Sequence, residues 1–265
     1  MSNRITLCWL GQSGFQLTGN GFDLLIDPYL SDSCAKLKSK LDHTRNTPIV
    51  RDPEKLKVDA YLITHAHADH FDPETIAPVM ANNPECRFLC PGDCRNKIGQ
   101  FFPECPEKFE SVSAGKMLRL APGIELHSIP AAHETLETDE NGEYKAVSFL
   151  INFRKENISF FFGGDTIPYP GQDAAILRNL PAGAELVMCL PANGRDDVRH
   201  AMGIAGNMDI DEAVDLAKKC NAALLIPCHI KMFAGNDPAE EITAEYCEKL
   251  GMKTLLPEAG KEIVL

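Results

Sequence analysis

Short apolar runs bounded by turn-forming residues recur along the whole chain and predict a succession of β-strands. The runs are Ile5–Leu10, Phe22–Ile26, Ala60–Thr64, Arg87–Cys90, Ile124–Ile129, Ala146–Phe153, Ile158–Phe162, Leu186–Leu190, Ala222–Ile226 and Thr254–Leu256. A short polar stretch, residues 154–157, joins two of these runs and indicates an antiparallel hairpin.

Helix signals are clearest late in the chain. Asp209 precedes Glu212 by three residues, which is the spacing of a capping box, and the apolar residues that follow share one helix face. Asp237 followed by Pro238 predicts a second helix start, and Gly251 predicts its end. Two earlier helices are expected over Pro73–Ala81 and Cys94–Phe102.

Hairpins mixed with strand–helix alternation predict an α/β fold in which two mixed sheets pack face to face, with helices on the outer faces. We find no repeat and no linker, so we expect a single domain over residues 1–265. Residues 31–57 are polar, Lys-rich and weakly periodic, which is typical of either a surface excursion or a lid over a site.

The charge balance restricts the partners. The formal net charge of −12 and the lack of a long basic run oppose binding to a nucleic-acid backbone, so we expect no nucleic-acid partner. A small anionic substrate stays compatible, because a few arginines can form a local positive pocket. No apolar run is long enough for a membrane span and no signal-type segment opens the chain, so we expect a cytosolic protein without a membrane partner. A homo-oligomer is compatible with the sequence.

Ten cysteines do not indicate a disulfide framework here, because a chain of this length can bury its own core. We expect reduced thiols that pack in the interior. Cys86, Cys90, Cys94 and Cys105 lack the two-residue gap of a common zinc knuckle, so packing is favoured over a metal site there.

One short segment concentrates metal-binding side chains. His65, His67, Asp69 and His70 follow directly on the apolar run 61–63, at the end of a predicted strand. Strand geometry places His65 and His67 on the same side, and a following turn can present Asp69 and His70 to a neighbouring ion. The alternative is a chance surface cluster, which the strand context disfavours.

Three later positions supply further candidate ligands. His133, Asp165 and His229 each follow a strand-like run. Taken singly, such a histidine is more often a hydrogen-bonded core residue, and Gly164-Asp165 is more often a turn. Together they extend the first cluster. Nitrogen and carboxylate ligands without thiolate suit Zn²⁺, Mn²⁺ or Fe, and a carboxylate can bridge two ions, a role that we assign to Asp165.

With these positions in place, the chain resembles the metallo-β-lactamase superfamily, whose fold is a four-layer αβ/βα sandwich with a dinuclear metal site at its edge. The resemblance implies that one ion is held by His65, His67 and His133. It implies that a second ion is held by Asp69, His70 and His229, and that both ions share Asp165.

Further segments resemble the L-ascorbate 6-phosphate lactonase branch of that superfamily. They are residues 9–15, 27–30, 191–196 and 206–208. The branch implies manganese as the metal, with zinc or iron as alternatives, and a lactone of a phosphorylated sugar or sugar acid as substrate.

The mechanism that we expect uses a hydroxide held between two divalent ions, which removes the need for a Ser or Cys nucleophile. One ion then polarises the substrate carbonyl while the other stabilises the departing alkoxide. We assign catalytic roles to Asp69, His70 and Asp165, and Asp69 is also a candidate proton carrier.

A phosphorylated substrate needs a positive subsite as well. Asn193, Arg195, Arg199 and His200 follow another strand end, and arginine offers bidentate contacts to phosphate. The alternative interpretation is a solvated loop in which the two arginines pair with neighbouring aspartates.

Other functions stay open. The runner-up is a thioester hydrolase of the glyoxalase II type, which is compatible with the same ligands. Two further alternatives belong to different classes of protein. One is an iron-dependent oxidoreductase, for which a single ion can suffice, and the other is a non-catalytic sensor of a sugar phosphate. Turnover with added metal separates the sensor from the enzymes.

Overall fold

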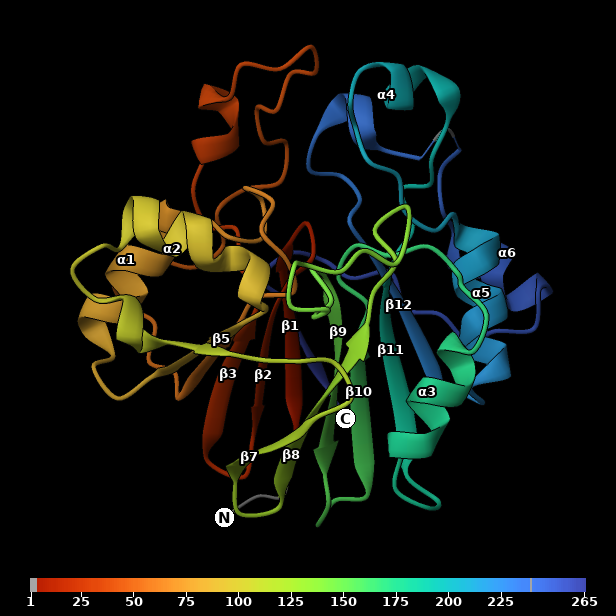
Figure 1. Cartoon of the computed structure of the whole chain (residues 1–265). Coiled ribbons are helices and arrows are strands. Elements are labelled where there is room, and N and C mark those ends of the chain that lie inside the picture. The colour runs from red at the N-terminus through yellow and green to blue at the C-terminus, as the bar shows by residue number, and fades with distance from the viewer. Residues whose placement is uncertain (1–3, 239) are drawn as a thin grey trace.

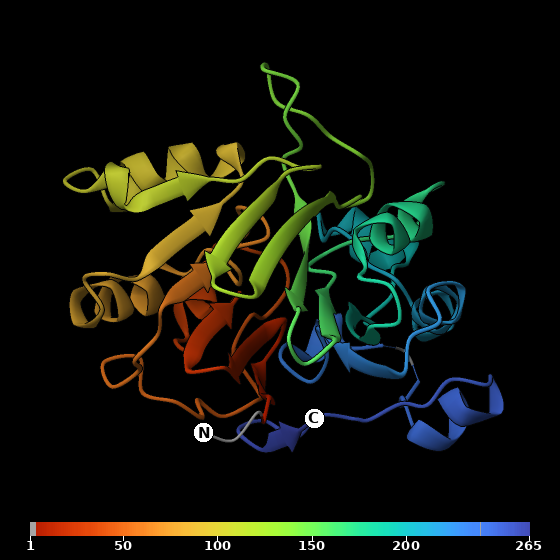
Figure 2. The ribbon, with the colours of Figure 1, turned by 90° about the horizontal axis from the view of Figure 1, so that it is seen from below.

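The central strands are buried on both faces, which explains why most of the apolar runs contain few polar residues. The computed structural model describes residues 4–238 and 240–265, and within them two β-sheets pack face to face (Figure 1). Helices cover the outer face of each sheet, so the molecule has four layers, as the sequence predicts (Figure 2).

The first sheet contains, in spatial order, β13 (Glu262–Val264), β1 (Thr6–Gly11), β2 (Gly14–Gly19), β3 (Phe22–Ile26), β4 (Ala60–Leu62), β5 (Arg87–Cys90) and β6 (Phe109–Ser111). The second contains β12 (Leu224–Cys228), β11 (Glu185–Pro191), β10 (Ile158–Phe162), β9 (Val147–Phe153), β8 (Ile124–Pro130) and β7 (Met117–Ala121). Both sheets are mixed: β3 to β6 are parallel neighbours, as are β10 to β12, and the other pairings are antiparallel.

Two helices, α1 (Pro73–Asn82) and α2 (Arg95–Phe101), lie outside the first sheet (Figure 1). Outside the second sheet lie α3 (Gln172–Asn179), α5 (Ile210–Lys219) and α6 (Ala244–Lys249). The short α4 (Asp197–Ala201) stands above the end of the sheets. None of the helices formed by the described residues has the length and apolar character needed to cross a membrane.

Alternation along the strands divides the interior into two cores. In β4, Ala60 and Leu62 face the core between the sheets, whereas Tyr61 faces the core beneath α1 and α2. Phe15 and Phe162 close the space between the sheets, with ring centroids 5.4 Å apart. The period-2 geometry of a strand therefore lets one apolar run serve two layers.

Several boundaries follow the sequence closely. Asp209 and Glu212 form the capping box of α5, and the hairpin over residues 154–157 joins β9 to β10. The ten cysteines are free, and Cys86, Cys90 and Cys94 pack beneath the outer helices, with Cys105 partly buried beside them. Packing accounts for the burial of that group.

Other expectations were wrong. The strand expected over Thr254–Leu256 is only an isolated bridge from Thr254 to Leu225, and the sequence pattern missed β2, β6, β7 and β13. The helix expected from Pro238 begins instead at Ala244, capped by Thr243. The reason is local: the Asp237 carboxylate accepts a hydrogen bond from the backbone of Lys231, so it closes a loop and caps no helix. Ala239, within the expected helix, lies outside the described residues.

Replacing Phe160 tests the packing between the sheets. Its ring is fully buried on β10 and meets Phe153 edge-on, with centroids 5.9 Å apart. We expect Phe160→Ala to lower the free energy of unfolding by about 3–5 kcal/mol in urea denaturation, because it leaves a cavity in a packed core. Phe101→Ala, at an exposed position on α2, is the control and should stay within about 0.5 kcal/mol of wild type. Equal losses in the two variants would contradict this placement of the core.

Candidate metal centre

The candidate ligands lie at one edge of the sandwich because parallel strands from both sheets end there. β4 in the first sheet leads into the segment from His65 to His70. In the second sheet, β8 leads to His133, β10 to Asp165 and β12 to His229. The structure thus brings together all seven ligands proposed from the sequence.

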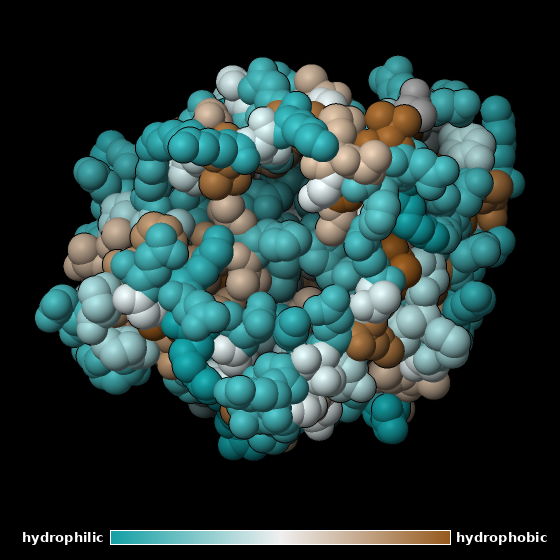
Figure 3. Space-filling model, turned by 45° about the horizontal axis from the view of Figure 1, so that its top comes forward, coloured by the Kyte–Doolittle hydropathy of each residue, from teal (hydrophilic) through white to brown (hydrophobic). Residues whose placement is uncertain are grey.

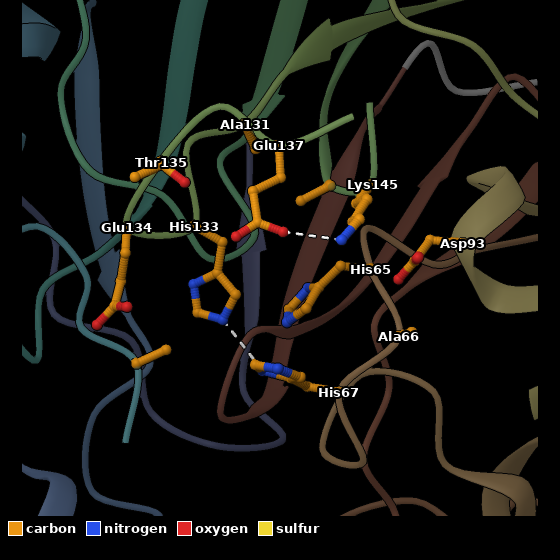
Figure 4. Close-up of a pocket in the computed structure, with 12 residues that line it drawn as sticks. His65, Ala66, His67, Asp93, Ala131, His133, Glu134, Thr135, Glu137 and Lys145 are labelled. Carbon is orange, nitrogen blue, oxygen red and sulfur yellow. Dashed lines mark hydrogen bonds and ion pairs between the residues drawn. The ribbon is translucent and has the colours of Figure 1, made fainter. Parts of the chain in front are cut away.

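The first group consists of His65, His67, His133 and Asp165, each of which offers one ligand atom within 4.8 Å of the others. His133 Nε2 lies 3.0 Å from His67 Nδ1 (Figure 4). Asp165 Oδ2 lies 4.0 Å from His65 Nε2 and 3.9 Å from His133 Nε2. These side chains converge on one point, as the ligands of a metal ion do.

The second group consists of Asp69, His70 and His229. Asp69 Oδ2 lies 3.7 Å from His70 Nε2 and 3.6 Å from His229 Nε2. Asp165 also reaches this group, with His70 Nε2 3.1 Å from its Oδ1 and His229 Nε2 3.3 Å from its Oδ2. Asp165 is therefore the side chain that the two groups share.

Unpartnered buried atoms show that the site fits metal ions. His65 Nε2, His70 Nε2 and Asp165 Oδ1 are buried and make no hydrogen bond of acceptable geometry, although the last two atoms lie 3.1 Å apart. Buried polar atoms almost always have a partner, and these three point into the space between the ligand groups. Imidazole nitrogen and carboxylate oxygen, without thiolate, are donors suited to Zn²⁺, Mn²⁺ or Fe.

The electrostatics of the cluster lead to the same conclusion. Burial, followed by the neighbouring His70, holds the pKa of His65 well below its usual value, and burial lowers the pKa of His133 to about 4. Burial alone would also lower the pKa of His229, but Asp165 and Asp69 outweigh it and raise that pKa to about 9. The carboxylates thus stabilise positive charge in the site. A proton on His229 supplies this charge here, and bound divalent ions would supply it in place of the proton.

Hydrogen bonds behind the ligands orient them. The buried Asp27, at the end of β3, lies 2.8 Å from His70 Nδ1 through its Oδ2. The Thr64 hydroxyl donates to the same oxygen at 2.6 Å, and the Thr64 backbone donates to Oδ1 at 2.8 Å. Such a contact fixes the ring orientation and leaves Nε2 of His70 for the ion.

Gly164 allows the two halves of the site to approach. Its φ is +60°, and a Cβ at this position would lie 2.8 Å from side-chain atoms of Thr64. A larger residue would separate the loop that carries Asp165 from the loop that carries His65, so glycine is required for both reasons.

Gln12, at the turn after β1, also reaches the ligands. Its Nε2 donates to Asp69 Oδ2 at 2.7 Å and lies 3.0 Å from His229 Nε2. Sequence reasoning noticed its segment but missed its place in the site, as it did for Asp27. A signal existed, because each residue follows a predicted strand of the first sheet, and the strand before Asp27, β3, is a parallel neighbour of β4.

His67 lines two pockets. The end of the molecule that Figure 3 turns toward the viewer is hollowed and mostly hydrophilic. One of the two pockets, of about 310 Å³, includes Asp93, Glu134, Glu137 and Lys145 in its wall (Figure 4). The other, of about 250 Å³, is walled on one side by the excursion over residues 31–57, through the residues Cys34, Leu37, Ser39 and His43.

Arg45 anchors this excursion. Its guanidinium donates to the carbonyl oxygens of Tyr29 at 3.1 Å, Ser31 at 2.5 Å and Thr47 at 2.7 Å. The excursion therefore forms a fixed wall of the second pocket in this structure.

None of the residues proposed to bind phosphate lines these two pockets, although they contact Glu134 and Asn236, which do. Arg195 donates twice to Glu212, at 2.6 Å each, and Arg199 donates to Asp196 at 2.6 Å. Together with Asn193 they line a separate pocket of about 480 Å³. His200 is exposed, 3.3 Å from Glu134. Their role in substrate binding stays a prediction.

Comparison with known proteins identifies the family to which this chain belongs. The family model described as a beta-lactamase superfamily domain matches residues 23–230, which include all seven proposed ligands. A metal-dependent hydrolase from Thermoplasma acidophilum is 24% identical over 268 residues, or 98% of each chain. A probable L-ascorbate-6-phosphate lactonase from Escherichia fergusonii is 28% identical over 242 residues, which are 88% of this chain and 66% of the relative.

Among solved structures, Igni18, a metallo hydrolase from Ignicoccus hospitalis, superposes with a TM-score of 0.71 at 20% identity. The alignment covers 99% of this chain and 98% of that one, and it shows a shared fold. Because the family match extends over most of the chain and over the whole ligand set, this chain belongs to the metallo-β-lactamase superfamily.

Proposed function

We propose that this metal-dependent hydrolase opens the lactone ring of a sugar or sugar acid. The observation that carries the proposal is the shared Asp165, which joins two ligand groups between two open pockets. The likeness to a probable lactonase over 88% of the chain supports a lactone as the substrate. A thioester of the glyoxalase II type is the runner-up within the same chemistry.

When bound, two divalent ions would supply a hydroxide at neutral pH and Lewis-acid stabilisation of the carbonyl oxygen. The chain's own residues position the reaction. Asp165 holds the two ligand groups together, and the pockets beside His67 give room for the two halves of the substrate. Asp69 lines the second pocket, and we assign its carboxylate the role of proton carrier.

The pocket charges favour a lactone without a phosphate group. Among the lining residues that the structure describes, Lys145 is the one lysine or arginine in either pocket, and its Nζ pairs with Glu137 at 2.9 Å. Asp93 and Glu134 add two more carboxylates to the same wall. A phosphate group that lay against this wall, away from the ions, would meet more carboxylates than cations. Carboxylates are instead good acceptors for the hydroxyl groups of a sugar ring.

A substrate panel tests the reaction class. We expect the chelated protein, reloaded with Mn²⁺ or Zn²⁺, to open a sugar lactone faster than it cleaves a thioester or a bis-aryl phosphodiester. His67→Ala should abolish this turnover, because it removes a ligand of the first ion. His127→Gln, on β8 and outside both ligand groups, is the matched control and should keep it. Thioester cleavage above lactone opening would overturn the proposed substrate class.

A matched pair of lactones, with and without a phosphate group, tests the charge argument. We expect the unphosphorylated lactone to have the higher kcat/KM, and Glu137→Gln to narrow the difference, because it removes one repelling carboxylate. Steady-state kinetics at two salt concentrations would check both, since the repulsion weakens with screening. A preference for the phosphorylated lactone would instead favour the subsite predicted around Arg195 and Arg199.

Asp27→Asn tests the support of the second ligand group. The amide is nearly the same size as the carboxylate but loses the charge that holds His70, so we expect affinity for the second ion to fall about 10–100-fold. Titration calorimetry with Mn²⁺ measures this directly. Asp23→Asn, on the same strand and hydrogen-bonded to Thr18, serves as the control. Unchanged affinity in Asp27→Asn would show that His70 is oriented by other contacts.

A further inference from the structure

Gln12 occupies a position that none of the expected roles explains. Its side chain is buried, and its amide nitrogen is within 3.0 Å of two proposed ligands of the second ion, Asp69 and His229. The atoms that it contacts, Asp69 Oδ2 and His229 Nε2, are the atoms that converge with His70 on this site.

The amide and an ion require the same lone pairs. In this structure the NH₂ group of Gln12 donates to Asp69 Oδ2 and faces His229 Nε2. A bound ion would take the lone pair of His229 Nε2, because a coordinating imidazole nitrogen has no second one to offer. In the occupied site His229 Nε2 therefore cannot accept a hydrogen bond from the NH₂ group, so the present amide orientation and the occupied site disfavour each other.

Reversal of the amide removes the conflict. The oxygen and nitrogen of a glutamine amide are nearly alike in size and exchange places by a half-turn of the side chain. Neighbouring ligand atoms that lie about 2.1 Å from one ion, at right angles, are about 3 Å apart. The separations of 2.7 and 3.0 Å between the Gln12 amide and its neighbours are of that size.

We propose that Gln12 coordinates the second metal ion through Oε1, beside Asp69, His70 and His229. The backbone of Gln12 suits this role because it is held firmly. Its carbonyl oxygen accepts hydrogen bonds from Trp9 Nε1 and from the His229 backbone, both at 2.9 Å. An amide oxygen adds a hard ligand, which favours Mn²⁺ over softer ions at this position.

Two variants distinguish the length of the Gln12 side chain from the chemical nature of its ligand atom. Gln12→Asn keeps the amide but shortens the side chain, and asparagine tolerates the left-handed backbone found here, at φ 51°. Gln12→Glu keeps the reach and replaces the amide oxygen by a carboxylate oxygen. The measurement is calorimetric titration of the chelated protein with Mn²⁺, followed by the visible absorption of the Co²⁺-loaded protein.

We expect Gln12→Asn to weaken the second ion at least about tenfold, with the first ion unaffected, and to change the Co²⁺ spectrum through a changed ligand set. Gln12→Glu should bind the second ion as tightly as wild type or more tightly. Gln16→Asn, on β2, is the control and should resemble wild type. A thermal melt of the chelated proteins verifies that each variant folds.

Three results would overturn the proposal. Tighter binding in Gln12→Asn would make Gln12 a competitor of the ion. Weaker binding in both variants with an unchanged Co²⁺ spectrum would reduce Gln12 to a hydrogen-bonding support of Asp69. No change in either variant would remove it from the site. The proposal rests on the metal centre and not on the lactone, and binding is measured without substrate, so either can fail alone.

Discussion

Everything at this edge of the molecule depends on the burial of carboxylates beside imidazoles. Asp165 is 4% exposed and His70 is fully buried, and an ionised group in such a place is costly unless a charge or a hydrogen bond compensates it. Protons on His70 and His229 compensate part of the negative charge, since the surrounding carboxylates outweigh burial and raise the pKa of both. Divalent ions would compensate it more fully and would also satisfy the nitrogen and oxygen atoms that have no partner. The fold thus carries an arrangement of ligands whose stability is tied to metal binding.

The sandwich makes this burial achievable. Ligands arrive from the ends of strands in both sheets, so no single loop has to hold the whole cluster. Asp27 and Thr64 connect the two neighbouring strand ends of the first sheet, and Gly164 lets the loop from the second sheet come into contact with them. The backbone conformations of Gln12, Asp27 and His229, each with positive φ, are concentrated at this edge. Strained backbone of this kind persists where surrounding contacts determine it, and here those contacts are the ones that orient ligands.

The sequence predicts an element correctly where the chemistry of one short segment determines it. The prediction fails where contacts with residues from elsewhere in the chain determine the local structure. The seven candidate ligands that the structure brings together were proposed from apolar runs that end in His or Asp, and α5 was predicted from a complete capping box. The capping signal at Asp237 misled, because only the fold shows that its carboxylate is taken by the backbone of Lys231. Short strands such as β6 and β13 owe their existence to pairing with longer neighbours, and a pairing across the sequence leaves no local pattern.

Contacts from elsewhere in the chain also decide what Arg195 and Arg199 can bind. From the sequence, Arg195 and Arg199 are cations near a strand end and therefore suit a phosphate. In the fold, Glu212 and Asp196 already hold them, and both arginines line a pocket other than the two that the ligands line. A phosphate would have to break paired, charge-assisted hydrogen bonds to recruit either one, while Glu137 and its neighbours repel it from the first pocket. Recognition of hydroxyl groups by those carboxylates requires no such exchange, which is why the geometry favours an uncharged sugar lactone within the reaction that the metal centre supports.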